Sequence, residues 1–467
     1  MLDILFNKNN LVGTMKKIVG EVNVLSDYEG IFMYSTDSTN ITNPKEMASV
    51  VVFPENTLQV SEIMKYAYSK KVPVIARAAG TNLCGACLPK KGGIILDFSK
   101  MNKILEINKN NLVCKVEPGV VIEDLQKEVE KYDLFYPPDP SNLKVSMIGG
   151  SIGLSSGGPH TFKYGATKDY VIGLEIVTSD GRIMHTGSNC SKDVTGYNMT
   201  QLFIGSEGTL GIVTKATLRL IPKPEAKRVM LAYFDTLEDT SKTANDIISN
   251  LITPSVIDLM DKNTLATVES FYPCGLKTDK TAALLIEIDG FKTNLGSQYE
   301  KIINICKVNN SSYIQTASTK EEEDRIWISR RSSFGATAKL APNVLTEDVV
   351  VPRENIVPLV KGIHEICDRY HLKTCIMGHI GDGNIHPNIA LDLRNPEEVL
   401  NFQMAKKELF ELALSLSGNL SGEHGIGCEK SGFLEQALDR NNLFFMKKMK
   451  EIFDPKNILN PGKIFNK

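Results

Sequence analysis

The chain has few cysteines and no excess of charge of either sign. Nine cysteines in 467 residues, scattered and odd in number, do not suit a disulfide framework, so we expect reduced thiols. Cys84 and Cys87 have the spacing of a redox or metal motif, but without a second pair nearby two small side chains in a tight loop are the better explanation. With 53 basic and 55 acidic side chains, the formal charge of −2 is too even for nucleic-acid binding.

Long hydrophobic runs are also missing. Residues 145–162 carry no charged side chain, but they are rich in glycine and serine, a composition for close backbone approach and not for spanning lipid. The N-terminal sequence shows no basic stretch followed by an apolar core and a cleavage site. We therefore expect no membrane segment, no export signal and a cytoplasmic location.

Hydrophobic residues make up 42% of the chain and charged residues 23%, which is typical of a globular protein of two or three domains. Apolar patterns predict a strand at 50–53, a helix around 60–67 and a strand at 72–76. Further strands are expected at 94–98, 104–107, 112–116, 174–177, 182–184 and 212–220, and a helix at 122–132.

Two prolines at 222 and 224 interrupt the periodicity, and we expect a domain boundary there. Beyond it, strands are predicted at 230–234, 282–288, 349–351 and 375–377, with helical stretches between them. The arrangement indicates an α+β protein without internal repeats.

Glycine-rich segments are the first chemical signal. They lie at 77–86, directly after a predicted strand, and at 148–153, 157–158 and 205–211. Small residues let backbone amides approach an anion, so these segments suit the pyrophosphate of a dinucleotide. Each segment taken alone also fits an ordinary turn. None has the spacing of the Rossmann or P-loop motifs, so a nicotinamide cofactor has no evident site.

A second signal combines imidazoles and a carboxylate. His379 and His386 flank a glycine-rich turn, and Glu423 and His424 lie in another glycine-rich stretch. His379, His386 and Glu423 are candidate ligands of a catalytic divalent metal, although single histidines in strands are often structural. Arg330 and Arg331, on a predicted helix, suit a substrate carboxylate as well as a solvated helix face.

Together these segments resemble the vanillyl-alcohol-oxidase type of FAD-binding oxidoreductase, in particular the D-2-hydroxyacid dehydrogenases that include the glycolate oxidase large subunit and D-lactate dehydrogenases. The resemblance extends from the Tyr34–Asp37 stretch to the Asn460–Lys463 stretch. It implies a two-part FAD-binding domain at 1–223 with an N-terminal extension of about 1–40. It also implies a substrate (cap) domain at 224–430, which contains the metal site. The C-terminal segment at 431–467 is implied to pack on the FAD domain and return to the flavin.

By the same resemblance, His424 is the catalytic base, His379, His386 and Glu423 bind zinc, iron(II) or manganese, and Arg330 or Arg331 holds the substrate carboxylate. The FAD is expected to be noncovalent, because the pyrophosphate loops contain no histidine. The residues implied to line it are Arg77, Ala79, Gly80, Thr81, Asn82, Leu83, Gly85, Pro138, Asp139, Ser141, Gly149, Gly150, Ser151, Gly153, Ser156, Gly157, Glu207, Gly208, Gly211, Ile212 and Asn460.

The resemblance also suggests a substrate and an electron acceptor. Some relatives that are specific for longer dicarboxylic 2-hydroxyacids carry a lysine where this chain has Thr346-Glu347-Asp348, so a small monocarboxylate such as D-lactate is expected. An electron-transferring flavoprotein, which in some relatives bifurcates electrons to NAD and ferredoxin, is the expected partner. The alternatives are a glycolate oxidase-type subunit with another acceptor, a metal-dependent hydrolase and a noncatalytic flavin carrier.

Overall fold

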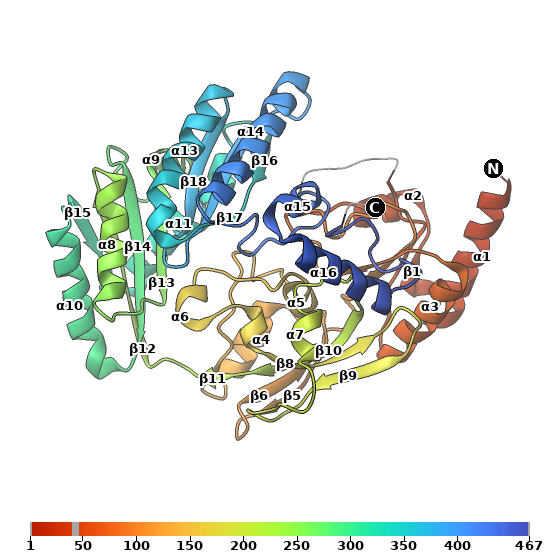
Figure 1. The fold of residues 1–467 in the computed structure, drawn as a ribbon. Coiled ribbons are helices and arrows are strands. Elements are labelled where there is room, and N and C mark those ends of the chain that lie inside the picture. The colour runs from red at the N-terminus through yellow and green to blue at the C-terminus, as the bar shows by residue number, and fades with distance from the viewer. Residues whose placement is uncertain (1, 40–45, 466–467) are drawn as a thin grey trace. The chain divides into compact units, whose positions relative to one another are not determined.

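The chain forms two compact units in this computed structural model, which describes residues 2–39 and 46–465 (Figure 1). The first unit comprises residues 1–156, 166–223 and 423–467, and the second comprises residues 157–165 and 224–422. The division expected from the sequence placed 157–165 in the first part and 423–430 in the second. Both stretches fall in the other unit here.

The first unit contains a four-stranded sheet of order β1-β2-β4-β3, formed by Val24–Leu25, Val50–Val52, Ile94–Asp97 and Val74–Arg77. β2, β4 and β3 run parallel, because helix α3 (Thr57–Lys70) crosses between β2 and β3. Helix α1 (Leu2–Val19) and α3 bury one apolar face each against these strands. The strand–helix–strand arrangement is as the sequence predicted.

A second sheet of this unit has the order β5-β6-β10-β8-β9 and is antiparallel throughout. Its strands are Ile104–Asn108, Val113–Val116, Ile212–Arg219, Val171–Val177 and Ile183–Gly187. β8 and β9 correspond to the strands expected at 174–177 and 182–184 and form a hairpin, whose turn includes Gly181 with a φ of 84°. Two short strands, β7 (Leu134–Phe135) and β11 (Ile221–Pro222), pair separately.

Short helices complete the first unit. They are η1 (Glu21–Asn23), α2 (Tyr28–Tyr34), α4 (Ile122–Glu130), α5 (Ile148–Leu154), η2 (Thr167–Asp169), α7 (Met199–Phe203), η4 (Ser431–Phe433), α15 (Leu434–Ala437) and α16 (Arg440–Phe453). Leu459 pairs with Val74 at the edge of the parallel sheet, so the C-terminal stretch is part of this core.

The second unit is built on one antiparallel sheet of eight strands. Its order is β15-β12-β14-β13-β18-β19-β16, and β17 also pairs with β19. The strands are β12 (Ala226–Phe234), β13 (Val256–Asp261), β14 (Ala282–Gly290), β15 (Tyr313–Thr316), β16 (Asn343–Thr346), β17 (Val349–Val350), β18 (Lys373–His379) and β19 (Asn384–Leu391). The sequence predicted β12, β14, β17 and β18 but not β13, β15, β16 and β19.

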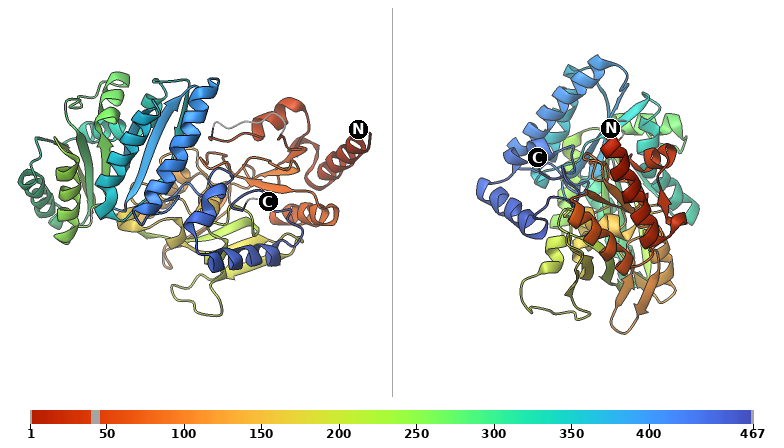
Figure 2. Two further views of the ribbon diagram at one scale, coloured as in Figure 1. Left: turned by 45° about the horizontal axis from the view of Figure 1, so that its top comes forward. Right: turned by 90° about the vertical axis from the view of Figure 1, so that its right-hand side faces the viewer.

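Helices lie on both faces of this sheet (Figure 2). They are α6 (Thr161–Tyr164), α8 (Leu237–Ser249), α9 (Lys262–Phe271), α10 (Lys292–Val308), α11 (Lys320–Arg331), α12 (Ser333–Thr337), η3 (Arg353–Asn355), α13 (Ile356–Arg369) and α14 (Pro396–Ser415). Apolar residues of α9 and α11 share a core with residues of β12, β13 and β14. Across the described residues of both units, no helix has the length and apolar character needed to cross a membrane.

Candidate active site

The glycine-rich segments of the first unit lie close together. The loop after β3 approaches helix α5 so closely that a Cβ atom placed on Gly150 would lie 3.4 Å from the Cβ of Ala78. Gly80 has a φ of 69°, which strains any residue with a side chain, and a Cβ there would lie 2.1 Å from the Arg77 guanidinium. Gly153 of α5, by contrast, borders open space, because a Cβ atom there would meet no atom within 4 Å.

The turn at 205–211 joins the same region. The amide of Glu207 donates a 2.8 Å hydrogen bond to the carbonyl of Gly153, at the end of α5. The side-chain amide of Asn460 donates to the carbonyls of Glu207 (2.7 Å) and Ala86 (2.9 Å). The structure thus brings together three of the predicted loops and the C-terminal residue Asn460.

The Glu207 carboxylate binds backbone amides of the protein. It is buried and accepts hydrogen bonds from the amides of Ile426 (2.7 Å) and Gly427 (2.8 Å). Burial raises the pKa of Glu207, and the two amides oppose that shift. Gly427 has a φ of 52°, and a Cβ there would lie 1.9 Å from the carbonyl oxygen of Cys84. The Glu423–Gly427 stretch is therefore tied to two of the predicted loops.

Arg77 anchors a neighbouring segment. Its Nη1 donates to the carbonyls of Tyr34 (3.2 Å) and Thr36 (2.5 Å), and its Nε lies 4.0 Å from Asp97. The side chain therefore fixes residues 34–36. Its contact with a cofactor stays a prediction, as do the contacts of the other implied FAD residues. All of those lie in the first unit except Gly157, which begins the 157–165 segment of the second.

The Cys84 and Cys87 pair has the properties of unreactive thiols. Burial raises the pKa of Cys84 well above its usual value and that of Cys87 to about 12. Among the described residues, none of the side-chain groups with metal-binding geometry includes a cysteine. These observations favour two small residues in a tight loop.

In the second unit, the β18–β19 hairpin brings two of the predicted metal ligands together. His379 is the last residue of β18 and His386 lies on β19, opposite Met377. Their ring centroids are 5.3 Å apart, and the ring planes meet at 81°. Both side chains are buried.

Asp258 is a site residue that the sequence analysis missed. It lies on β13 directly opposite His379, and its two carboxylate oxygens are 2.7 Å from His379 Nδ1 and 2.6 Å from Arg330 Nε. Burial alone would raise the pKa of Asp258, but the charges of His379 and Arg330 hold it below its ordinary value. The carboxylate at the centre of the otherwise apolar stretch 256–260 was the available signal.

A second missed carboxylate, Asp348, stands beside the other histidine. It lies 3.7 Å from His386 Nδ1 and accepts hydrogen bonds from Asn384 Nδ2 (2.7 Å), Ser421 Oγ (2.5 Å) and the amide of Gly422 (3.1 Å). Asp348 thereby fixes the chain immediately before Glu423. The predicted roles of Glu423 and His424, which belong to the first unit, stay predictions.

The two arginines that the sequence left as alternatives have different environments. Arg330 is 4% exposed, is bound to Asp258, and lies with Nη1 3.0 Å from the sulfur of Met377. Arg331 is exposed, and its guanidinium lies 5.0 Å from the centre of the Trp327 ring. Of the two, Arg330 is the one beside the histidines.

These donor sets fit the expected groups. Two buried imidazoles, of which His379 is held by the Asp258 carboxylate and His386 lies 3.7 Å from that of Asp348, have the ligand chemistry of a divalent metal site. The small residues of these loops, with open space beside Gly153, suit the pyrophosphate of FAD.

Comparisons with known proteins agree with these features. The family described as "FAD binding domain" matches residues 48–187, and the family described as "FAD linked oxidases, C-terminal domain" matches residues 223–464. The chain therefore belongs to the FAD-linked oxidoreductases and, within them, to the D-2-hydroxyacid dehydrogenase family. The predicted family and the predicted α+β fold are confirmed, and the hydrolase alternative is not retained.

Individual relatives cover nearly the whole chain. The glycolate oxidase subunit GlcD of Bacillus subtilis is 44% identical over 97% of this chain and 96% of its own length. The D-lactate dehydrogenase of Archaeoglobus fulgidus is 33% identical over 90% of this chain and 91% of its own. The structure of p-cresol methylhydroxylase with substrate bound has a TM-score of 0.81 at 18% identity, covering 98% of this chain and 97% of its own, which shows a shared fold.

Proposed function

We propose that this protein oxidises a small D-2-hydroxyacid, D-lactate, to the 2-oxoacid with noncovalent FAD as the hydride acceptor. The observation that carries the proposal is the Asp258 carboxylate, which holds His379 on one oxygen and Arg330 on the other. In a member of this family, that arrangement places Arg330, a cation that can bind the substrate carboxylate, beside His379, an imidazole that can bind a metal. Arg330, rather than Arg331, is the residue proposed to bind the substrate.

The FAD, held by the loops around Gly80, Gly150 and Gly208, supplies N5 as the hydride acceptor when bound. His379, His386 and Glu423 are the proposed ligands of zinc, iron(II) or manganese, which supplies a Lewis acid for the substrate hydroxyl. The contact of Asp258 with His379 Nδ1 leaves Nε2 as the nitrogen that ligates. His424 is the proposed base that takes the hydroxyl proton.

The proposed metal and the proposed base differ in how much each would lower the activation free energy. A catalytic metal lowers the pKa of a bound water by about 8 to 9 units, which corresponds to on the order of 10 kcal/mol. A general base contributes about 10²- to 10⁴-fold, or roughly 3 to 5 kcal/mol. Glu423→Gln should therefore lower turnover more than His424→Asn does. A wild type whose turnover is indifferent to metal removal and readdition contradicts the metal role.

The residues at 346–348 support a monocarboxylate substrate. Glu347 is buried and lies 3.1 Å from Lys406 Nζ, and Asp348 is buried among hydrogen-bond donors. Two carboxylates occupy this stretch where dicarboxylate-specific relatives are expected to carry a lysine. A second substrate carboxylate placed there would meet negative charge.

Glycolate is a second candidate substrate. It is favoured by the 44% identity with the glycolate oxidase subunit of Bacillus subtilis, whereas D-lactate is favoured by two relatives named D-lactate dehydrogenase at 33% identity. The two substrates differ by one methyl group, and a pocket distinguishes such a difference by only about 1 to 3 kcal/mol. Both compounds therefore belong in the same experiment.

The test is an anaerobic absorption titration of the purified holoenzyme. D-Lactate, L-lactate, glycolate and D-2-hydroxyglutarate are added separately, and bleaching of the flavin band is recorded. We expect bleaching by D-lactate and none by D-2-hydroxyglutarate. Arg330→Lys should abolish bleaching at concentrations that saturate the wild type, and Arg331→Ala is the matched control that should retain it. A yellow protein that no 2-hydroxyacid bleaches is a flavin carrier, and the proposal is then wrong.

We further propose an electron-transferring flavoprotein as the physiological electron acceptor, passing electrons to NAD and, by bifurcation, to ferredoxin. The support is the family resemblance. Pull-down from native extract followed by reconstituted hydroxyacid-dependent NAD reduction tests the proposal. Recovery of this chain alone argues against it.

A further inference from the structure

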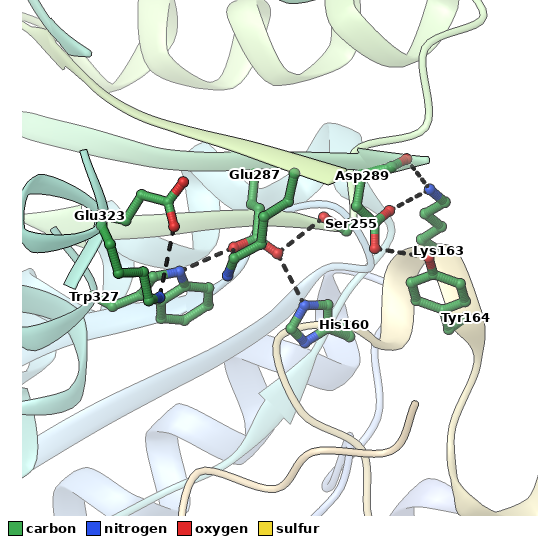
Figure 3. A network of polar contacts seen from close by, with 10 residues as sticks. His160, Lys163, Tyr164, Ser255, Glu287, Asp289, Glu323 and Trp327 are labelled. Atoms are coloured by element: carbon green, nitrogen blue, oxygen red, sulfur yellow. Dashed lines mark hydrogen bonds and ion pairs between the residues drawn. The ribbon is translucent and has the colours of Figure 1, made fainter. Parts of the chain in front are cut away.

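A buried carboxylate lies on β14, outside the histidine cluster. The oxygens of Glu287 are 3.2 Å from His160 Nε2, 2.8 Å from Lys227 Nζ, 3.2 Å from Ser255 Oγ and 3.0 Å from Trp327 Nε1 (Figure 3). These four partners come from the 157–165 segment, from β12, from the residue before β13 and from α11. Glu287 therefore joins four parts of the second unit at one point.

The surroundings of this carboxylate favour its ionised form. Burial by itself would raise the pKa of Glu287, but His160 and Lys227 lower it to about 2. A negative charge that is almost completely buried is stable only with several donors around it. Loss of the charge should consequently loosen every element that it contacts, including α11.

Glu287 and Asp258 lie on the same face of the sheet. Glu287 pairs with Val256 on β13, and Asp258, two residues further along that strand, pairs with Leu285. Directly paired residues in an antiparallel sheet point to one face, and so do residues two apart in a strand. The two carboxylates therefore point from neighbouring strands toward the same covering helix, α11.

Helix α11 contacts these carboxylates through two residues that are three apart. Trp327 donates to Glu287, and Arg330 donates to Asp258. Residues at that spacing lie on one side of a helix, one turn from each other. The rotation of α11 about its axis, and with it the direction of the Arg330 side chain, is thus set at two points.

We propose that Glu287 is a positioning residue for Arg330 and acts through Trp327 and α11. The inference rests on the proposed function, in which Arg330 binds the substrate carboxylate. Without the Glu287 contact, α11 keeps only one of its two contacts with buried carboxylates, the one between Arg330 and Asp258, and gains freedom to turn. Substrate binding should weaken because the guanidinium is no longer held ready for the carboxylate.

Glu287→Gln and Trp327→Phe test the proposal in the full-length holoenzyme. The matched control is Asp289→Asn, because Asp289 lies on the same strand and face and is bound by Lys163 and Tyr164 of the same 157–165 segment (Figure 3). We expect the KM for the hydroxyacid to rise by roughly tenfold in both test variants, with kcat changed less, because the arginine contact exists before and during reaction. The KM of Asp289→Asn should stay within about twofold of the wild type.

Equal KM values in the wild type, Trp327→Phe and Asp289→Asn overturn the proposal. Trp327→Phe keeps Glu287 and its other three donors, so it decides the question even where Glu287→Gln does not fold. Uniform loss of kcat with unchanged KM in the test variants also contradicts positioning.

A separate measurement does not depend on turnover. Trp327 is the single tryptophan of the chain, so its fluorescence reports on its own environment. We expect a shifted emission and faster amide exchange over residues 320–331 in Glu287→Gln but not in Asp289→Asn. If no hydroxyacid reduces the flavin of the wild type, the proposed function fails, and this comparison still decides whether Glu287 holds α11. Unchanged emission and exchange refute that role.

Discussion

Removal of the Asp258 charge should damage both stability and metal affinity. Asp258 is fully buried and lies 2.6 Å from Arg330 Nε and 2.7 Å from His379 Nδ1. In Asp258→Asn the side chain keeps its shape, but the buried guanidinium of Arg330 loses its counter-ion. Removing one partner of such a pair costs about 3 to 5 kcal/mol of unfolding free energy. For a unit of this size, that loss lowers the melting temperature by roughly 10 °C.

The second consequence concerns the proposed metal. Loss of a carboxylate that orients a ligating histidine typically lowers metal affinity by about 10- to 100-fold. Calorimetric melting measures the stability change, and competition with a chromophoric chelator measures the affinity for zinc, iron(II) and manganese. Both are compared with the wild type at the same pH and salt concentration.

Asp261→Asn is the matched control for this prediction. Asp261 lies three residues further along β13 and accepts a hydrogen bond from the amide of Thr264 (2.7 Å) as the cap of α9. Asparagine caps a helix as well as aspartate does, so the replacement removes only the ion pair with His364 (3.1 Å), which should lower stability by about 1 kcal/mol or less and leave metal affinity unchanged. If Asp258→Asn binds metal as tightly as Asp261→Asn and melts within about 2 °C of it, the reasoning about the buried pair is wrong.

Two further predictions concern backbone conformation and pH. Gly427→Ala should reduce FAD content and melting temperature, because its Cβ would lie 1.9 Å from the carbonyl oxygen of Cys84, whereas Gly13→Ala, with nothing within 4 Å, should change neither for the worse. Normal flavin content in purified Gly427→Ala contradicts this. The hydrogen bond with Asp261 raises the pKa of His364 above 6.5, so the stability it contributes is complete below pH 6.5 and is lost as pH rises through the folded pKa. The melting difference between the wild type and His364→Gln should therefore shrink at alkaline pH, and a constant difference refutes it.

Sequence patterns predicted those features that depend on neighbouring residues. The strand–helix–strand unit that begins at Val50 follows from short apolar runs and a helical period, which are local properties. The domain boundary expected at the two prolines also rested on a local signal, the interruption of the apolar periodicity. β13 and β19 were missed because they carry polar residues among apolar ones. Where the polar residues of an antiparallel strand are also buried, apolar and polar residues no longer alternate in the way that marks a strand in the sequence.

By itself, the sequence determined which chemical groups are present: the glycine loops, the two histidines, the adjacent arginines and the family to which they point. Only the tertiary structure decided that Arg330 and not Arg331 stands beside His379, and that Asp258, far away in the chain, joins them. The reason is physical. Residue type and local periodicity are encoded along the chain, whereas the pairing of β13 with β18 and the rotation of α11 depend on contacts between residues distant in sequence.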